Sequence, residues 1–281
     1  MEEEKEMAII EQESLAELRN KGIDTIPRLF QYRTKIWKDH VAMRDKVLGV
    51  WKEFTWGDYG EKVERVALGL LELGMKKEDT AAILSENCPE WLFCDEGILA
   101  AGGVTVGVYA TDSASQIEYI ADNCGARFFF VEDEEQLDKI LEVREKTPAV
   151  EKIIVYDMKG LRDFEDPMVI SFDDLLELGE ESRSKQSETM KSAIANSDPE
   201  ELAILVYTSG TTGPPKGAML SHKNITETMF NFQEIEPPPE GFVDEVLTFL
   251  PLCHIAERGV SGFGPLVSGT IINFAESMAT V

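Results

Sequence analysis

Positive charge is scarce in this sequence. Its 281 residues include 27 Lys and Arg against 53 Asp and Glu, which gives a formal net charge of −26. Nucleic acids and anionic membrane surfaces are bound by clustered basic side chains, so neither partner is expected. The excess of acidic residues is explained most simply by solubility. Any anionic ligand must be held by local donors against this overall field.

Cysteine, histidine and long apolar runs are also scarce. The four cysteines form no CxxC pair and there are three histidines, so neither a disulfide framework nor a structural zinc site is expected. Uncharged stretches such as residues 97–111 are too short and too rich in glycine to cross a bilayer. The acidic residues 1–14 are unlike a basic targeting peptide. We therefore expect a cytoplasmic protein without a transmembrane segment.

The first predicted elements are a hairpin and a helix. Residues 41–56 predict two short strands around a turn. Thr55 and Asp58 then have the spacing of a capping box, which marks the start of a helix. Apolar residues recur at helical intervals until Gly74, which is a typical stop.

From residue 80 onward, apolar strands alternate with amphipathic helices. Asn87 is the predicted cap of the first of these helices; the next begins with a Ser113/Gln116 capping box and stops at Gly125. Apolar strands separated by such helices predict a parallel sheet covered on both faces. The predicted fold class is therefore α/β, with parallel sheets flanked by helices. Its strands are expected at residues 80–85, 104–109, 127–131 and 152–157.

The composition changes after residue 158. Residues 179–201 are polar and charged with few large apolar side chains, and they predict an irregular or helical connection over the surface. An apolar strand is expected again at 202–208, and residues 221–232 read as the start of a helix.

The segment YTSGTTGPPKGAMLSHKN, residues 207–224, carries the strongest chemical signal. Gly210 and Gly213 allow the backbone to turn its N–H groups toward a bound anion. Lys216 adds a compact cation. Four hydroxyl groups could donate to phosphate oxygens or accept toward a metal, those of Thr208, Ser209, Thr211 and Thr212. The segment predicts a loop that binds phosphate.

Two common phosphate-loop patterns do not fit this segment. The Walker A pattern needs glycine immediately before the lysine, where Pro215 stands, and no GxGxxG pattern is present. The alternative is a flexible surface loop rich in Ser, Thr and Gly. A strand before the loop, a helix after it, two stiffening prolines and Lys216 favour the phosphate site.

The same segment resembles the signature of the adenylate-forming (AMP-binding) superfamily. Residues 87–120 resemble the segment that these enzymes carry before the loop. Residues 131–157 and 249–277 are most similar to the long-chain fatty acyl-CoA synthetase branch, and the resemblance runs from about residue 28 to the end. It implies an ATP-dependent long-chain fatty acid–CoA ligase. The fatty carboxylate attacks the α-phosphorus of ATP to give acyl-AMP and pyrophosphate, and coenzyme A then displaces AMP. The implied substrates are fatty acid, ATP and CoA, with Mg²⁺ as the metal.

The resemblance also implies roles for individual residues. The β- and γ-phosphates would be held by Thr208, Ser209, Gly210, Thr211, Thr212, Gly213 and Lys216. Thr208 would be a candidate Mg²⁺ ligand, although the family's glutamate partner lies in a stretch that this sequence lacks. No catalytic residue is assigned within these 281 residues.

His254, in the segment LPLCHIAER, matches a family position that lines the acyl and adenylate pocket. The residues alone fit equally well a loop histidine bonded to the backbone. Glu257 and Arg258 are expected to form a structural ion pair. Cys253 and His254 are not expected to form a nucleophile and base, because adjacent residues on an extended chain point to opposite faces.

The family enzymes continue beyond the last residue of this sequence. We therefore expect residues 1–281 to be a truncated N-terminal domain, inactive alone, with the C-terminal domain absent. Residues 1–200 would form a first α/β portion with an N-terminal helix and hairpin, and 201–281 the start of a second portion that carries the phosphate loop. Three alternatives stay open: a ligase for another carboxylic acid, an acyl-AMP ligase that never uses CoA, and a non-catalytic nucleotide-binding module. A homodimer is also left open.

Overall fold

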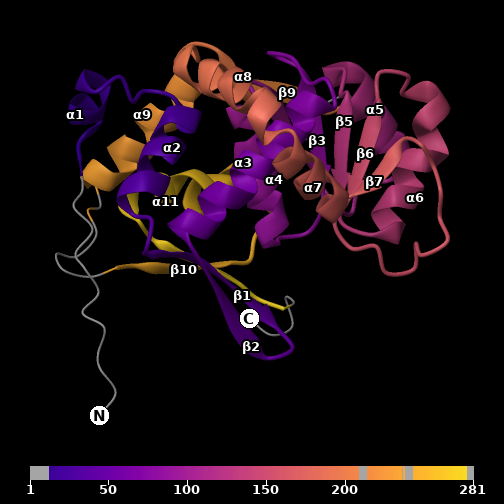
Figure 1. Cartoon of the computed structure of the whole chain (residues 1–281), viewed down its shortest axis with the longest axis horizontal. Helices are drawn as coiled ribbons and strands as arrows, with labels where there is room; N and C mark the ends of the chain where they lie inside the picture. Colours follow the sequence, from indigo (N-terminus) through magenta and orange to yellow (C-terminus); the bar gives the residue numbers. More distant parts are fainter. Residues whose placement is uncertain (1–12, 209–213, 236, 238–242, 277–281) are drawn as a thin grey trace.

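A seven-stranded sheet forms the centre of the molecule (Figure 1). The computed structural model describes residues 13–208, 214–235, 237 and 243–276. The strand order is β7-β6-β5-β3-β4-β8-β9, and each neighbouring pair is parallel except the antiparallel pair β8 and β9. The strands are β3 (Thr80–Leu84), β4 (Val104–Val108), β5 (Phe128–Val131), β6 (Lys152–Val155), β7 (Val169–Ser171), β8 (Leu202–Thr208) and β9 (Lys216–Ser221).

The predicted α/β class and the four predicted parallel strands are confirmed. Side chains from alternate positions of the strands enter two separate apolar cores, one on each face of the sheet. One core contains α5 (Ala114–Cys124) and α6 (Glu134–Val143), which is followed by the short η1 (Arg144–Lys146). The other contains α3 (Trp56–Glu72), α4 (Pro89–Ala100), α7 (Phe172–Glu181) and α8 (Arg183–Ala195).

Some of the predicted helix starts and ends agree with the structure and one does not. The capping boxes of α3 and α5 and the left-handed Gly125 after α5 are confirmed. The prediction that Asn87 caps α4 is wrong, because the N-cap residue is Cys88 and makes no side-chain cap bond. The segment 159–201 contains two helices, α7 and α8, and the short strand β7.

A second sheet of four strands joins segments far apart in the sequence. Its order is β10-β11-β1-β2, with β1 (Val41–Val47), β2 (Val50–Thr55), β10 (Glu245–Thr248) and β11 (Ile271–Phe274). The predicted hairpin is the β1–β2 pair, which projects from the body of the molecule in Figure 1. The pairing of β1 with β11 and the strand β9 were not predicted. The remaining helices are α1 (Leu15–Asn20), α2 (Ile26–Ile36), α9 (His222–Ile235), α10 (Ile255–Glu257), the π-helix η2 (Arg258–Phe263) and α11 (Gly264–Ser268).

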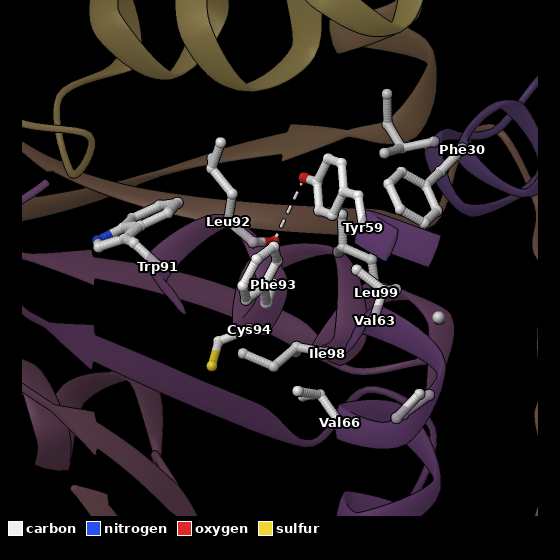
Figure 2. Packing of buried hydrophobic residues seen from close by; sticks show 14 of the residues in the cluster. Phe30, Tyr59, Val63, Val66, Trp91, Leu92, Phe93, Cys94, Ile98 and Leu99 are labelled. Carbon is white, nitrogen blue, oxygen red and sulfur yellow. Dashed lines mark hydrogen bonds between the residues drawn. The ribbon is translucent and has the colours of Figure 1, made fainter. Parts of the chain in front are cut away.

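Helices α3 and α4 pack against each other in the core. Figure 2 shows Tyr59, Val63 and Val66 of α3 beside Phe93 and Ile98 of α4. Every residue of α4 except Glu90 is buried, so its apolar residues surround the helix rather than forming one stripe. Burying α4 also buries the carboxylates that it carries, which must then be paired or neutral.

Asp95 of α4 is paired with Arg258 at the start of η2. Both side chains are almost completely buried, and Arg258 Nε donates to Asp95 Oδ2 at 2.8 Å while its Nη2 contacts Oδ1. The predicted ion pair between Glu257 and Arg258 is therefore wrong. Glu257 instead accepts from the backbone N–H of Leu250 and the hydroxyl of Ser261. The pair Asp95–Arg258 ties the segment after β10 to the central helix α4.

His222 begins α9 and its side chain is buried. Burial lowers its pKa to about 4, despite the opposing effect of Glu201 nearby. The neutral imidazole is therefore the form compatible with the fold. Because the pKa in the unfolded chain is about 6.5, the unfolded chain binds more protons between pH 4 and 6.5.

The free energy of unfolding is expected to depend on His222 in this window. The contribution is fully present above pH 6.5 and is lost as the pH falls toward 4, by up to about 3 kcal/mol. Replacing His222 with Gln should flatten this part of the stability profile. Chemical denaturation of both forms at pH 7.5, 6, 5 and 4 measures it. Parallel profiles for the wild type and His222→Gln would contradict the assignment.

Candidate functional site

The β8–β9 hairpin positions the described ends of the predicted phosphate loop. Thr208 is the last residue of β8 and Lys216 the first of β9, and their Cα atoms are direct partners in the antiparallel register. Side chains of directly opposed residues point to the same face of a sheet. Both side chains are exposed, so they are available to a ligand at this edge. Five other predicted loop residues lie outside the described residues, namely Ser209, Gly210, Thr211, Thr212 and Gly213.

A polar cavity of about 280 Å³ lies at the carboxyl ends of β4 and β8. This is the edge of a parallel sheet at which α/β proteins bind their ligands. The cavity is lined by Thr208 and Pro215 from the hairpin, by His254, and by residues of β4, α5 and the β4–α5 connection. The structure therefore brings Thr208 and His254, 46 positions apart in the sequence, to the wall of one cavity.

The segment that carries His254 is held from three sides. The side chain of Asn87, which follows β3, donates to the carbonyl of Leu250 at 2.7 Å and accepts from the N–H of Leu252 at 2.8 Å. The Glu257 carboxylate accepts from the N–H of Leu250 at 3.2 Å. On the third side, β4 has a glycine, Gly107, where a Cβ atom would lie only 2.6 Å from the Cα of Cys253. The position of His254 is thus fixed by its neighbours along the chain.

His254 itself is exposed and caps the short helix α10. Its Nδ1 accepts from the backbone N–H of Ala256 at 3.1 Å, so Nε2 is the ring nitrogen left to face a ligand. Cys253 beside it is buried, and burial raises the pKa of the thiol to about 12. With this pKa the Cys253 thiol stays protonated near neutral pH, and a protonated thiol is a poor nucleophile. Cys253 is thus buried whereas His254 is exposed, as expected for adjacent residues that point to opposite faces.

Two further titratable groups line the polar cavity. Burial raises the pKa of the Tyr109 hydroxyl and that of the Asp112 carboxyl. For Asp112, a backbone bond from Tyr109 and the charge of Lys139 act in the opposite direction. Asp112 is the carboxyl group among the lining residues of this cavity.

An apolar cavity of about 590 Å³ adjoins the polar one. It lies between β9, α9 and the segment α10–η2, and its lining includes Ile225, Met229, Gly259, Val260 and Phe263. Ile255 lines both cavities, with His254 on the polar side and Ala256 on the apolar side. The two cavities therefore have Ile255 in common as a lining residue. Such a pair suits a ligand with a polar, anionic part and an apolar part.

A metal ion has few protein ligands available in residues 13–208, 214–235, 237 and 243–276, which the structure describes. No group of three or more His, Cys, Asp or Glu side chains in that part of the chain could hold an ion. Mg²⁺ is commonly bound by few protein oxygens together with substrate phosphates. The single hydroxyl of Thr208 fits that mode of binding. It could not hold the ion without the phosphates. In the same described part, no helix is long and apolar enough to cross a bilayer.

Sequence reasoning found Thr208, Lys216 and His254 but missed several residues around them. The sequence predicts Asn87 as a helix cap, yet its side-chain amide bonds the backbone of a segment more than 160 positions away. Gly107 lies inside an apolar strand, where a glycine indicates close approach of another backbone, and that signal could have found it. Ile255 and Gly259 have no local signal for a cavity wall.

Three comparisons with known proteins agree with this geometry. The family model described as AMP-binding enzyme matches residues 30–280. Long-chain-fatty-acid–CoA ligase ACSBG2 of Xenopus laevis is 34% identical over 256 residues, covering 90% of this chain and 34% of that protein. Human long-chain-fatty-acid–CoA ligase ACSBG1 is 34% identical over 254 residues, with the same coverage. The chain thus spans about a third of the length of the curated relatives it matches.

Solved structures show the same fold at lower identity. The luciferase-like enzyme of the mealworm Zophobas morio superimposes with a TM-score of 0.72 at 20% identity, covering 90% of this chain and 55% of that one. The anthranilate CoA ligase AuaEII, solved with anthranoyl-AMP, gives a TM-score of 0.73 at 22% identity, covering 90% and 45%.

The segment around His254 should depend on the Asn87 amide. In Asn87→Ala, the N–H of Leu252 loses its acceptor and the carbonyl of Leu250 loses a donor. We expect the amides of residues 250 and 252–254 to exchange with solvent about 30-fold faster, because two hydrogen bonds of about 1 kcal/mol each are lost. Hydrogen exchange read by mass spectrometry measures this. Asn196→Ala, which removes a bond to Ser192 at the end of α8, is the control, and equal exchange in both variants would contradict the role of Asn87.

Proposed function

The chain belongs to the AMP-binding enzyme family, and on that premise we propose that the whole protein is an AMP-forming long-chain fatty acid–CoA ligase. Its substrates would be a fatty acid, ATP and coenzyme A. The relatives that carry this name are 34% identical over 90% of the chain, which supports the proposal. The four cysteines are all free, which suits the reducing cytoplasm proposed as its location.

One observation carries the substrate class: the apolar and polar cavities meet at Ile255. A fatty acid has a long apolar chain and a single carboxylate. With the chain in the apolar cavity, the carboxylate would emerge beside His254 and the end of β8. ATP in the polar cavity would then present its α-phosphorus to that carboxylate. Holding the two reactants in this geometry removes much of the entropic cost of their encounter.

The chain's own residues would serve mainly to bind and orient the triphosphate. Lys216 lies opposite Thr208 on one face of the hairpin, and it directly follows Pro215; Thr208 and Pro215 both line the polar cavity. We assign the β- and γ-phosphates to Lys216 and Thr208 together with Ser209, Gly210, Thr211, Thr212 and Gly213. Mg²⁺ bound to the phosphates would neutralise part of their charge, with Thr208 as one oxygen ligand. Local donors of this kind are required because the chain as a whole is strongly acidic.

His254 would orient the adenylate and the carboxylate. Its Nδ1 is occupied by the Ala256 N–H, so Nε2 carries the proton in the neutral ring and can donate to an oxygen of the ligand. The ring lies on the polar side of Ile255, where the carboxylate and the α-phosphate would meet. No proton transfer is assigned to it.

The proposed reaction is tested directly with the whole protein. Purified protein, ATP, Mg²⁺ and CoA are incubated with saturated acids of 4 to 20 carbons and with benzoate, and acyl-CoA and AMP are quantified. The proposal expects acyl-CoA and AMP in equal amounts, with long-chain acids preferred. Acyl-AMP without acyl-CoA would identify a ligase that does not use CoA. A preference for benzoate, or no product at all, would reject the proposed substrate.

Lys216→Ala should lower kcat/KM for ATP by about ten- to a hundredfold. The substitution removes a charged hydrogen bond of about 1.5–3 kcal/mol, and about 1.4 kcal/mol corresponds to a factor of ten. The melting temperature should hardly change, because the side chain is exposed. Lys159→Ala, at a lysine exposed far from the hairpin, is the control. ATP kinetics equal to those of the wild type would remove the phosphate role of Lys216.

The apolar cavity predicts a change in chain-length preference. A Cβ atom on Gly259 would lie 3.5 Å from Met229 Cε, an ordinary contact, so a larger side chain can enter the cavity. In Gly259→Leu we expect the preferred acid to become shorter, with about fourfold lower kcat/KM for each methylene displaced, since a buried methylene is worth about 0.8 kcal/mol. The KM for ATP should stay within about twofold. An unchanged chain-length profile in Gly259→Leu, relative to Ser192→Leu on the exposed surface of α8, would exclude this cavity as the acyl site.

A further inference from the structure

Helix α5 contacts both arms of the β8–β9 hairpin through two residues that are four positions apart. The Tyr119 hydroxyl donates to the carbonyl of Pro215 at 3.0 Å. One turn further along α5, Asn123 Oδ1 accepts from the Tyr207 hydroxyl at 2.6 Å. Residues at i and i+4 lie on the same face of a helix. One face of α5 therefore contacts both arms of the hairpin: β8 through Tyr207, and the residue before β9, Pro215.

These contacts enclose Lys216 from both sides along the chain. Pro215 precedes it and is fixed through its carbonyl by Tyr119. Gly217 follows it and lies directly opposite Tyr207 in the register. A Cβ atom on Gly217 would be only 3.2 Å from Tyr207 Cζ, so the ring lies against this glycine. The backbone of Lys216 is thus set by the positions of two tyrosines.

Helix α5 is itself firmly placed. It begins with the Ser113/Gln116 capping box and ends at the left-handed Gly125. Ile117 and Ile120 are buried in the apolar core on this face of the sheet. Gln116 and Ile120 also line the polar cavity, so the helix is one wall of the site as well as the support of the hairpin.

We propose that Tyr119 and Asn123 are positioning residues that fix the backbone of Lys216 at the rim of the polar cavity, where its ammonium group meets the triphosphate of ATP. This inference rests on the proposed function. Tyr119 and Asn123 act through Lys216 rather than by touching ATP. Proline lacks an N–H, so Pro215 offers only its carbonyl to its surroundings, and Tyr119 is the residue that binds it. Without that bond the arm before β9 is free to shift, and Lys216 shifts with it.

A purely structural role for Tyr119 predicts a different result. Loss of the hydroxyl would then lower the melting temperature and leave the use of ATP unchanged. The conservative variant Tyr119→Phe separates the two, because it keeps the ring and removes only the hydrogen bond to Pro215. Tyr207→Phe does the same for the bond to Asn123. Tyr32→Phe is the matched control, since the Tyr32 hydroxyl also has a side-chain partner, Lys21, at 3.2 Å, on a different part of the molecule.

The first measurement needs no catalytic activity. Hydrogen exchange of the whole protein without ligand is followed in peptides that cover residues 214–221. We expect faster exchange in Tyr119→Phe and Tyr207→Phe than in the wild type, and no change in Tyr32→Phe. Unchanged exchange in both hairpin variants would overturn the inference, because α5 would then not restrain this segment.

The second measurement is a double-mutant cycle in ATP kinetics. Tyr119→Phe should lower kcat/KM for ATP by about three- to tenfold, as expected for one neutral hydrogen bond, with KM for fatty acid and CoA within about twofold. In the Lys216→Ala background the same substitution should have less than about a twofold effect, because the group that it positions is gone. An undiminished loss in that background, or no loss in the wild-type background, would overturn the inference.

The two measurements also separate this inference from the proposed function. If the wild type forms no acyl-CoA from ATP, the proposed function fails and the ATP role of Tyr119 fails with it, whereas the exchange result still decides whether α5 holds the hairpin. If the wild type is active and Tyr119→Phe keeps normal ATP kinetics, only the positioning role fails.

Discussion

The placement of β8 between β4 and β9 is the constraint on which the site depends. Parallel pairing with β4 brings the carboxyl end of β8 to the edge of the sheet where the polar cavity lies. Antiparallel pairing with β9 then returns the chain, so that Lys216 stands opposite Thr208. A change of one residue in this register would move every side chain of β9 to the opposite face. Leu220 would then leave the face on which it now lines the apolar cavity, and Lys216 would no longer share a face with Thr208.

Individual charges in this strongly acidic molecule are balanced by groups close to them. The net charge of −26 opposes the approach of a triphosphate, so the edge where it would bind must supply its own donors. One buried cation, Arg258, is instead matched inside the protein. Arg258 is buried against Asp95 and lies over the ring of Trp91, 5.0 Å from its centroid. Removing one partner of such a pair leaves an uncompensated buried charge, so the segment that carries His254 is coupled to α4.

Much of the fold could be predicted because its signals are local. Strand and helix periodicity placed β3, β4, β5 and β6, and short capping patterns placed the starts of α3 and α5. Only the β1–β2 hairpin of the four-stranded sheet could be predicted, because β1 also pairs with β11, for example Met43 with Ile272, across most of the sequence. Strand β9 was missed because its sequence, KGAMLS, lacks the β-branched and aromatic residues typical of strands.

The site shows the same division between local and tertiary signals. Thr208 and Lys216 belong to one continuous motif, and their positions in the hairpin agree with it. Asn87 was read as a helix cap because the local pattern allows it, whereas its partners lie beyond residue 249. Glu257 and Arg258 are adjacent and opposite in charge, yet each is satisfied by residues that only the fold brings near. Neighbours in sequence are weak guides where several buried partners compete.

The most direct test of this account is a crystal structure of the whole protein with a long-chain acyl-AMP. The account predicts that the adenylate occupies the polar cavity beside Thr208 and His254, and that the acyl chain passes Ile255 into the cavity bounded by Met229 and Gly259. An acyl chain bound elsewhere in the molecule, or an adenylate remote from the end of β8, would contradict it.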